Sequence, residues 1–149
     1  KAETIAKNSV TSPDFVIALH ACDTASDDAI AWGINNGAKV ILVAPCCHHD
    51  LQTQLINAPE PWSILTKSGL MKERFGDLLT DSIRAQILKL KGFRTDIIEF
   101  IASEHTPRNL LIRAVYTGAK RDESELAKYK ELCAMWGVCT NLSDRCIDR

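Results

Sequence analysis

The chain has 149 residues, of which 46% are hydrophobic and 25% are charged, and its formal net charge is −1. This balance is that of an ordinary globular domain, and it gives no overall attraction toward nucleic acid or an anionic membrane. The sequence shows no signal peptide and no apolar run of membrane-spanning length, so we expect a cytoplasmic protein. There the six cysteines should be thiols, because their spacings match no disulfide framework.

Two apolar runs without alternation, Phe15 to Leu19 and Val40 to Ala44, predict strands that are covered on both faces in a parallel sheet. The segment between them predicts a helix that is capped by Thr24 or Ser26 and ends at Asn36-Gly37. We expect a right-handed crossover, since strand, helix and parallel strand pack together in that hand.

Polar and sulfur-bearing residues begin where each of these two runs stops. The carboxyl ends of parallel strands meet at one edge of a sheet, where open α/β sheets bind their ligands, so we expect these residues to form one site. They are His20, Cys22 and Asp23 after the first run, and Pro45, Cys46, Cys47, His48, His49 and Asp50 after the second.

The middle of the chain predicts a surface excursion followed by a helix. Residues 58–76 contain Pro and Gly at intervals and have the character of a loop that contacts substrates. Apolar residues at helical spacing then predict a helix from about Asp77 to Lys91, which Gly92 stops.

Two further strands and a helix complete the predicted elements. The strands, Asp96 to Ala102 and Leu110 to Tyr116, must be antiparallel because their connection is too short for a crossover helix. The last helix opens with Asp122 and Glu125, a pair similar to a capping box. The tail beyond Gly137 is expected to be poorly fixed.

The order of these elements is similar to the second half of a class I S-adenosylmethionine-dependent methyltransferase. The segments LHACDTASDDAI, VAPCCHHDL and EHTPRNLLIRA sharpen this likeness, because they resemble the methyltransferase-domain-32 family, which includes relatives of a tRNA 2′-O-methyltransferase. The resemblance covers residues 13–116. It implies a Rossmann-like α/β fold in which the runs at 15–19 and 40–44 are the fourth and fifth strands and the antiparallel hairpin is the sixth and seventh.

The glycine-rich loop and the acidic residue with which this family holds S-adenosylmethionine have no counterpart here. We therefore expect a carboxyl-terminal fragment that is inactive alone, with residues 1–121 as half of a methyltransferase domain and 122–149 as a terminal helix and tail. The strand at 15–19 would then be an unprotected edge. We expect a missing amino-terminal half or a second subunit to cover it.

The resemblance implies methyl transfer from S-adenosylmethionine, with Leu19, His20, Ala21 and Cys22 beside this cofactor. Methyl transfer is an in-line displacement that needs a positioned nucleophile and, for a hydroxyl or a protonated amine, removal of a proton. His20 and Asp23 are our candidates for the base or its orienting partner. The structural alternatives are that Asp23 caps the next helix and that His20 is a wall residue.

Residues from two parts of the chain are candidates for binding the methyl acceptor. In the resembled family the loop between the last two strands borders the target site, although a plain hairpin turn is an equal alternative here. The candidates are Pro45, Cys46, Cys47, His48 and His49, together with Glu104, His105, Arg108 and Asn109 of that loop.

The run Cys46-Cys47-His48-His49 also suggests zinc, with Cys22, His20 or His105 as remaining ligands. We expect no metal, because adjacent residues project differently and no CxxC spacing is present.

RNA is the acceptor that we favour, for two reasons. The family includes a tRNA-modifying relative, and the stretch from Arg84 to Arg121 is basic, with eight Lys or Arg residues and three acidic ones. A solvated surface is the alternative for that stretch. Two other function classes remain open: a non-catalytic methyltransferase-like docking subunit, and a metal-binding protein that uses the Cys/His cluster.

Overall fold

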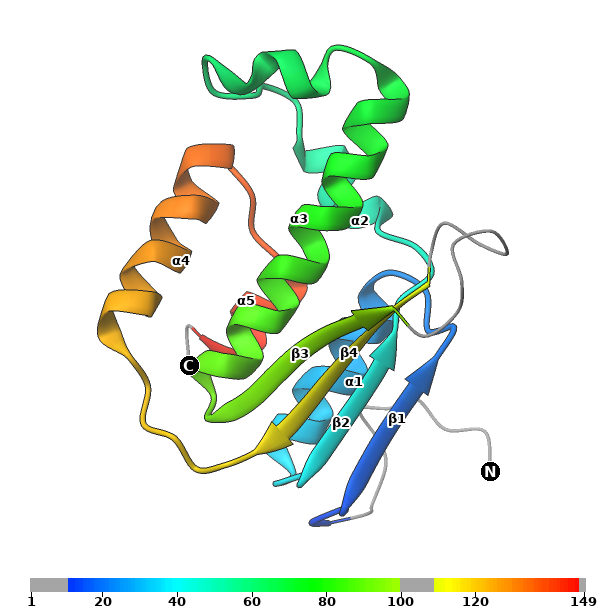
Figure 1. The fold of residues 1–149 in the computed structure, drawn as a ribbon, viewed down its shortest axis with the longest axis vertical. Coiled ribbons are helices and arrows are strands. Elements are labelled where there is room, and N and C mark those ends of the chain that lie inside the picture. The colour runs from blue at the N-terminus through cyan, green and yellow to red at the C-terminus, as the bar shows by residue number, and fades with distance from the viewer. Residues whose placement is uncertain (1–10, 100–108, 148–149) are drawn as a thin grey trace.

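The computed structural model describes residues 11–99 and 109–147, and four of its segments form one mixed β-sheet (Figure 1). The strands are β1 (Phe15–Leu19), β2 (Val40–Ala44), β3 (Phe93–Glu99) and β4 (Leu110–Tyr116), in the spatial order β1-β2-β4-β3. β1 and β2 are parallel, whereas β4 is antiparallel to both β2 and β3. The predicted parallel pair and antiparallel hairpin are therefore confirmed.

In chain order, the helices of the described residues are α1 (Thr24–Asn35), α2 (His49–Gln54), the 3₁₀ helix η2 (Trp62–Thr66), α3 (Gly69–Leu90), α4 (Glu123–Trp136) and α5 (Asn141–Cys146). α1 is the crossover between the two parallel strands, and α3 lies between the sheet and α4 (Figure 1). None of the described helices is both long enough and apolar enough to cross a membrane.

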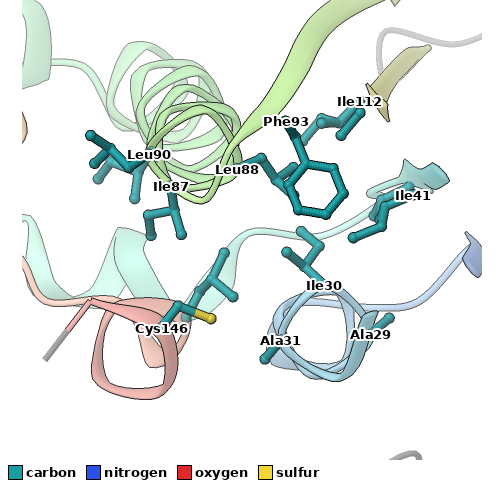
Figure 2. Close-up of a cluster of buried hydrophobic side chains, with 14 of the residues drawn as sticks. Ala29, Ile30, Ala31, Ile41, Ile87, Leu88, Leu90, Phe93, Ile112 and Cys146 are labelled. Carbon is teal, nitrogen blue, oxygen red and sulfur yellow. The ribbon is translucent and has the colours of Figure 1, made fainter. Parts of the chain in front are cut away.

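The hydrophobic core lies between one face of the sheet and helices α1, α3 and α5. Ile30 of α1, Ile87 and Leu88 of α3, and Ile112 of β4 are each completely buried within it (Figure 2). α1 approaches the sheet closely because Gly33 has no side chain, and a Cβ there would stand 2.9 Å from Ile41 Cδ1. The buried face of α1 thus combines small residues, Ala29 and Gly33, with Ile30.

The opposite side of β1 is open, and this corrects the expectation that the strand is covered on both faces. Phe15, Ile17 and Leu19 are 61–63% exposed, while Val16 and Ala18 between them are buried. An apolar strand of five residues does not by itself reveal how many layers cover it, because packing partners decide that. That a further protein surface covers this strand stays a prediction.

The amino-terminal end of α1 differs from the predicted capping. Asp23 occupies the cap position, with φ of 53° and no capping hydrogen bond from its side chain. The Ser26 hydroxyl instead donates to the Ala21 carbonyl oxygen over 2.5 Å, so it braces the loop before the helix. The predicted carboxyl-terminal end is confirmed, because Asn36 is the residue that follows the last helical position.

α3 and β3 both begin earlier than predicted. α3 starts at Gly69 rather than near Asp77, and it contains Gly76, where a Cβ would lie 2.5 Å from Gln52 Cγ. Close packing on α2 thus retains a glycine inside a helix, where it is unfavourable by about 1 kcal/mol relative to alanine. β3 starts at Phe93, directly after the turn at Gly92, whose φ is +88°.

The carboxyl-terminal segment contributes to the core. The Asp122 side chain accepts the backbone N–H groups of Ser124 and Glu125, which confirms the predicted start of α4. The tail was expected to be poorly fixed, but α5 forms there, with Leu142 completely buried and Cys146 2% exposed. The Tyr129 and Ser143 hydroxyls hydrogen-bond between α4 and α5. The segment is largely polar in sequence, but Leu142 and Cys146 anchor it in the core.

Candidate functional site

The polar residues that follow β1 and β2 meet at one edge of the sheet. Leu19 pairs with Ala44, so the two parallel strands end at the same level. The Asp23 carboxylate then accepts the Asp50 backbone N–H, over 3.1 and 3.0 Å to its two oxygens. The loop after β1 and the segment after β2, which contain the candidate site residues, are therefore joined directly.

Asp23 acts on a different helix from the one expected. As a cap of α1 it would accept hydrogen bonds from that helix, but its carboxylate is directed to the first turn of α2. His20 precedes it in the same loop, and both residues have positive φ, of 54° and 53°. Left-handed backbone costs a residue other than glycine about 1–3 kcal/mol and is often found at functional sites. The His20 side chain is exposed, so it is accessible to a ligand.

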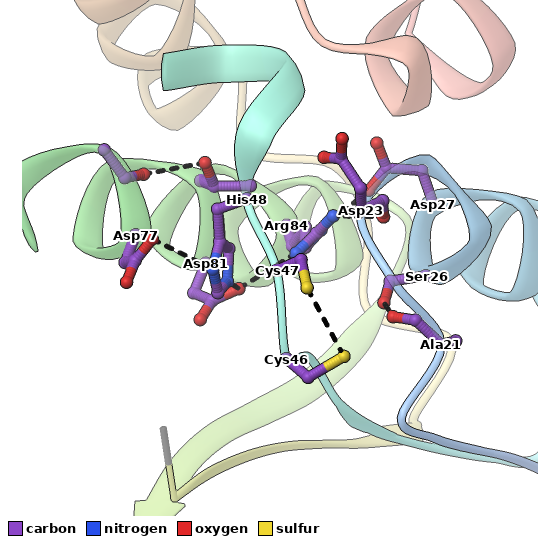
Figure 3. A network of polar contacts seen from close by, with 12 residues as sticks. Ala21, Asp23, Ser26, Asp27, Cys46, Cys47, His48, Asp77, Asp81 and Arg84 are labelled. Carbon is purple, nitrogen blue, oxygen red and sulfur yellow. Dashed lines mark hydrogen bonds and ion pairs between the residues drawn. The ribbon is translucent and has the colours of Figure 1, made fainter. Parts of the chain in front are cut away.

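A buried guanidinium, that of Arg84, links the segments that lie beneath this sheet edge (Figure 3). Arg84 of α3 is 1% exposed, and its Nε donates to Asp27 Oδ1 over 2.7 Å while Nη1 donates to Asp81 Oδ1 over 3.1 Å. Its Nη2 donates to the Asp23 carbonyl oxygen over 2.8 Å. One side chain thus joins α1, α3 and the loop after β1.

The network contains one cation, Arg84, for two paired carboxylates, Asp27 and Asp81. Burial raises the pKa of Asp27 above its ordinary value, and the adjacent Arg84 charge offsets this only in part. Two carboxylates share the single guanidinium, since Asp81 also pairs with Arg84. We therefore expect the neutral form of Asp27 to be favoured more than it is in an exposed aspartate.

His48 extends the network to the strand end. The residue is 3% exposed, and its Nε2 lies 3.0 Å from Asp81 Oδ1 in a hydrogen bond. Its Nδ1 lies 3.1 Å from Asp77 Oδ1 but without the alignment of a hydrogen bond. The ring is thus held between two acids of α3, one turn apart.

A small cleft opens beside this histidine. Its volume is about 160 Å³, and it is lined by Pro45, His48, Arg74, Asp77, Leu78, Asp81 and Leu110. Two predicted acceptor-binding residues, Pro45 and His48, therefore share a cleft with side chains of α3. Neighbouring His49 is exposed and lines a separate depression with Gln52 and Lys72.

Three thiols gather next to the network, on the side of the β1 loop. Cys22 Sγ lies 3.1 Å from Cys46 Sγ, and Cys47 Sγ lies 3.8 Å from Cys46 Sγ. The hydrogen bond with Cys22, together with burial and the contact with Cys47, raises the pKa of Cys46 to about 12. At neutral pH the central sulfur of this group is therefore a thiol, with little thiolate available for nucleophilic attack.

The remaining predicted residues lie in three different places. Leu19 is on the open face of β1, and the Ala21 carbonyl oxygen accepts the Ser26 hydroxyl. Asn109 is buried, and its side-chain amide donates to Glu99. This hydrogen bond links the last residue of β3 to the residue that precedes β4. Glu104, His105 and Arg108 lie outside the described residues.

Sequence reasoning missed the acids and the arginine of the network. Arg84 was counted with a basic surface stretch, but its burial removes it from that surface. A signal was present, because Asp77, Asp81 and Arg84 recur at helical spacing on the same side as buried Leu88. The pairing of Arg84 with Asp27, 57 positions away in sequence, is visible only in three dimensions.

Comparison with known proteins agrees with this part of the fold. Residues 1–54 match the model of the methyltransferase-domain-32 family, which is described as a methyltransferase domain. No curated protein and no solved structure shows significant similarity to the chain. The matched segment includes β1, α1, β2 and α2, and with them both loops of the candidate site. The resemblance is thereby confirmed for the first two motifs, and residues 1–54 are similar to a methyltransferase domain; the third motif lies outside the matched segment.

Proposed function

We propose that the protein takes part in methyl transfer from S-adenosylmethionine to RNA. The observation that carries the proposal is that the segment similar to a methyltransferase domain is also the one that brings His20, Asp23 and the Cys-Cys-His run to a single sheet edge. Ligand sites of open α/β sheets lie at this edge.

The described residues fit one side of a cofactor site. His20 and Cys22 are exposed at the end of β1, and Leu19 presents an exposed apolar side chain beside them. The cleft next to His48 has a volume of about 160 Å³, whereas sites for small molecules usually span roughly 300–1,000 Å³. Leu19, His20, Ala21 and Cys22 would accordingly form a wall for the cofactor rather than enclose it.

S-adenosylmethionine, when bound, supplies the methyl group, and the chain's own residues handle the acceptor. We assign proton removal from the acceptor hydroxyl or amine to His20, because its ring is exposed at the strand end. Asp23 is a positioning residue, because its carboxylate fixes the start of α2 against the loop that contains His20. Pro45 and His48 would contact the acceptor in the cleft that they line.

RNA is proposed as acceptor with narrower support. The stretch from Arg84 to Arg121 contains fewer available cations than its sequence suggests, because Arg84 is buried and Arg113 pairs with Asp96 over 2.9 Å. Lys89, Arg94 and Lys120 are exposed and remain able to meet phosphates. The similarity of the motifs to those of a tRNA-modifying relative is the other support.

The decisive experiment compares methylated nucleosides in total RNA from cells that carry the wild-type gene, a deletion, or the His20→Ala allele. We expect one methylated nucleoside to be lost in both mutants, whereas Lys130→Ala, an exposed change on α4, should preserve it. Unchanged RNA would contradict RNA as acceptor. Unchanged RNA together with no methyl transfer to protein or small molecules in labelled extracts would favour the docking-subunit alternative.

Kinetics then test the assignment of roles. His20→Ala and Asp23→Asn should lower kcat more than they weaken binding of S-adenosylmethionine, since both act on the acceptor side. If these variants keep near-normal turnover while Cys47→Ser or His48→Ala abolishes it, the residues that follow β2, and not His20 and Asp23, carry out the chemistry.

A further inference from the structure

Three thiols gather at the sheet edge, and the proposed methyl transfer uses only one of them, Cys22, as part of the cofactor wall. We infer that Cys22, Cys46 and Cys47 bind a thiophilic cation of the Zn²⁺ type through their three sulfur atoms. All three Sγ atoms lie within 4.8 Å of one another. The site shares Cys22 with the proposed cofactor wall, but its test measures metal binding and does not depend on activity.

The spacing of the sulfur atoms suits one metal ion. A tetrahedral zinc with Zn–S bonds of about 2.3 Å holds its sulfur ligands about 3.8 Å apart. Cys46 and Cys47 already have this separation, at 3.8 Å, and Cys22 and Cys46 are closer, at 3.1 Å. The Cys22–Cys46 pair would have to open by less than an ångström, and the exposed position of Cys22 permits this.

The structure removes one of the two objections to a metal, namely that adjacent residues cannot converge on one ion. Adjacent residues usually project in different directions, but β2 ends at Ala44, before the two cysteines, so strand alternation no longer applies to them. Cys22 approaches from the other loop, which Asp23 holds in place through Asp50. Two separate segments therefore converge on one point, as ligands of a metal site do.

The surrounding side chains favour an all-sulfur site. Nearby oxygen and nitrogen ligands have other partners: the Asp23 carboxylate accepts the Asp50 N–H, and Asp81 accepts from Arg84 and from His48. Soft thiolate ligands select Zn²⁺ or Cu⁺ over Mg²⁺ or Ca²⁺. Because Cys22 is exposed, a fourth coordination position would face solvent.

The binding step balances without redox chemistry. Each of the three thiols gives its proton to the buffer, three Zn–S bonds form, and the oxidation state of sulfur and of zinc is unchanged. The ion would join the loop after β1 to the end of β2 and so tie together the two sides of the sheet edge. The expected result is a rise in melting temperature when Zn²⁺ is added.

The test titrates Zn²⁺ into the chain, purified without a metal-affinity step and held reduced, in competition with a chromophoric chelator. We expect one equivalent to bind. Cys22→Ser, Cys46→Ser and Cys47→Ser should each weaken binding by more than about tenfold, since changes in the outer shell alone cost about 10–100-fold. Cys139→Ser is the control, because this exposed cysteine lies after α4 and away from the cluster.

A second measurement keeps the inference testable if a variant fails to fold. Co²⁺ bound to the wild-type chain should show the sulfur-to-cobalt charge-transfer absorption of a multi-thiolate site. Absence of stoichiometric Zn²⁺ binding would overturn the inference. So would a Co²⁺ spectrum without thiolate bands, or a Zn²⁺ affinity that is unchanged in all three cluster variants.

Discussion

The Arg84 network and the three-cysteine cluster adjoin the same strand end, yet they differ in how their groups are paired. In the network, Arg84 donates from three nitrogens to buried or half-buried acceptors, and His48 is enclosed between two acids. In the cluster, the sulfur atoms hydrogen-bond with one another, Cys22 Sγ also lies 3.8 Å from the His20 carbonyl oxygen, and Cys22 is exposed. The network is therefore suited to holding the fold, whereas the cluster is suited to meeting a ligand.

The largest effect is expected from breaking the network at its centre. Arg84→Met would leave Asp27 and Asp81 buried without their cation, and removal of one partner of a buried pair costs about 3–5 kcal/mol. Denaturant unfolding measures this loss. Lys89→Met, on an exposed position of the same helix, should change the free energy of unfolding by no more than about 0.5 kcal/mol. Equal losses in both variants would mean that α3 is sensitive for reasons other than ion pairing.

Substitution of His48 and of its neighbour His49 tests which of the two side chains belongs to the network. His48→Ala removes the hydrogen bond to Asp81 in a buried position, and we expect a loss of about 1–3 kcal/mol in the free energy of unfolding. His49→Ala changes an exposed side chain and should stay within about 0.5 kcal/mol. A larger loss for His49 than for His48 would contradict the described pairing. Thermal or denaturant unfolding under identical buffers checks both variants.

A smaller effect is expected in the cysteine cluster. Without added metal, Cys22→Ala should change the free energy of unfolding by no more than about 0.5 kcal/mol, because the side chain is exposed and its hydrogen bonds, to the Cys46 thiol and the His20 carbonyl oxygen, are weak sulfur contacts. Cys146→Ala, at a position that is 2% exposed between α5 and the core, should cost more. The reverse order would show that the cluster has a structural role even without an ion.

The smallest and most specific effect is a dependence on pH that comes from Asp27. Its folded pKa lies above the unfolded value of 3.8 because of burial, so the folded state binds the proton more readily than the unfolded chain does. The stability due to this group is present below pH 3.8 and is lost as the pH rises through the folded pKa. The free energy of unfolding of wild type minus that of Asp27→Asn should therefore increase as the pH falls.

Denaturant unfolding of both proteins at several pH values above their acid transition measures this difference. Substitution by Asn removes the titrating group while preserving the shape of the side chain. A difference that instead decreases on acidification would mean that the attraction of Arg84 outweighs burial, and that the pKa of Asp27 is lowered.

The elements with strong local signals were predictable. Strands β1, β2 and β4 appear with the predicted bounds, since runs of β-branched and apolar residues flanked by turns are local features. The start of α4 was also predictable, because Asp122 caps the helix through atoms only two and three residues away. The start of α3 was not, because Gly69 and Gly76 oppose a helix locally and packing against η2 and α2 overrides them.

For the candidate site, the sequence by itself determined which residues meet. Parallel strands end at one edge, so His20, Cys22 and Asp23 had to lie near Cys46, Cys47 and His48 once β1 and β2 were paired in register. Only the tertiary structure decided what each residue does there. It directs Asp23 to α2, encloses His48 between acids of α3 and brings three sulfurs together. The reason is physical: these roles depend on distances to groups far along the chain, such as Arg84, and local sequence patterns carry no information about those distances.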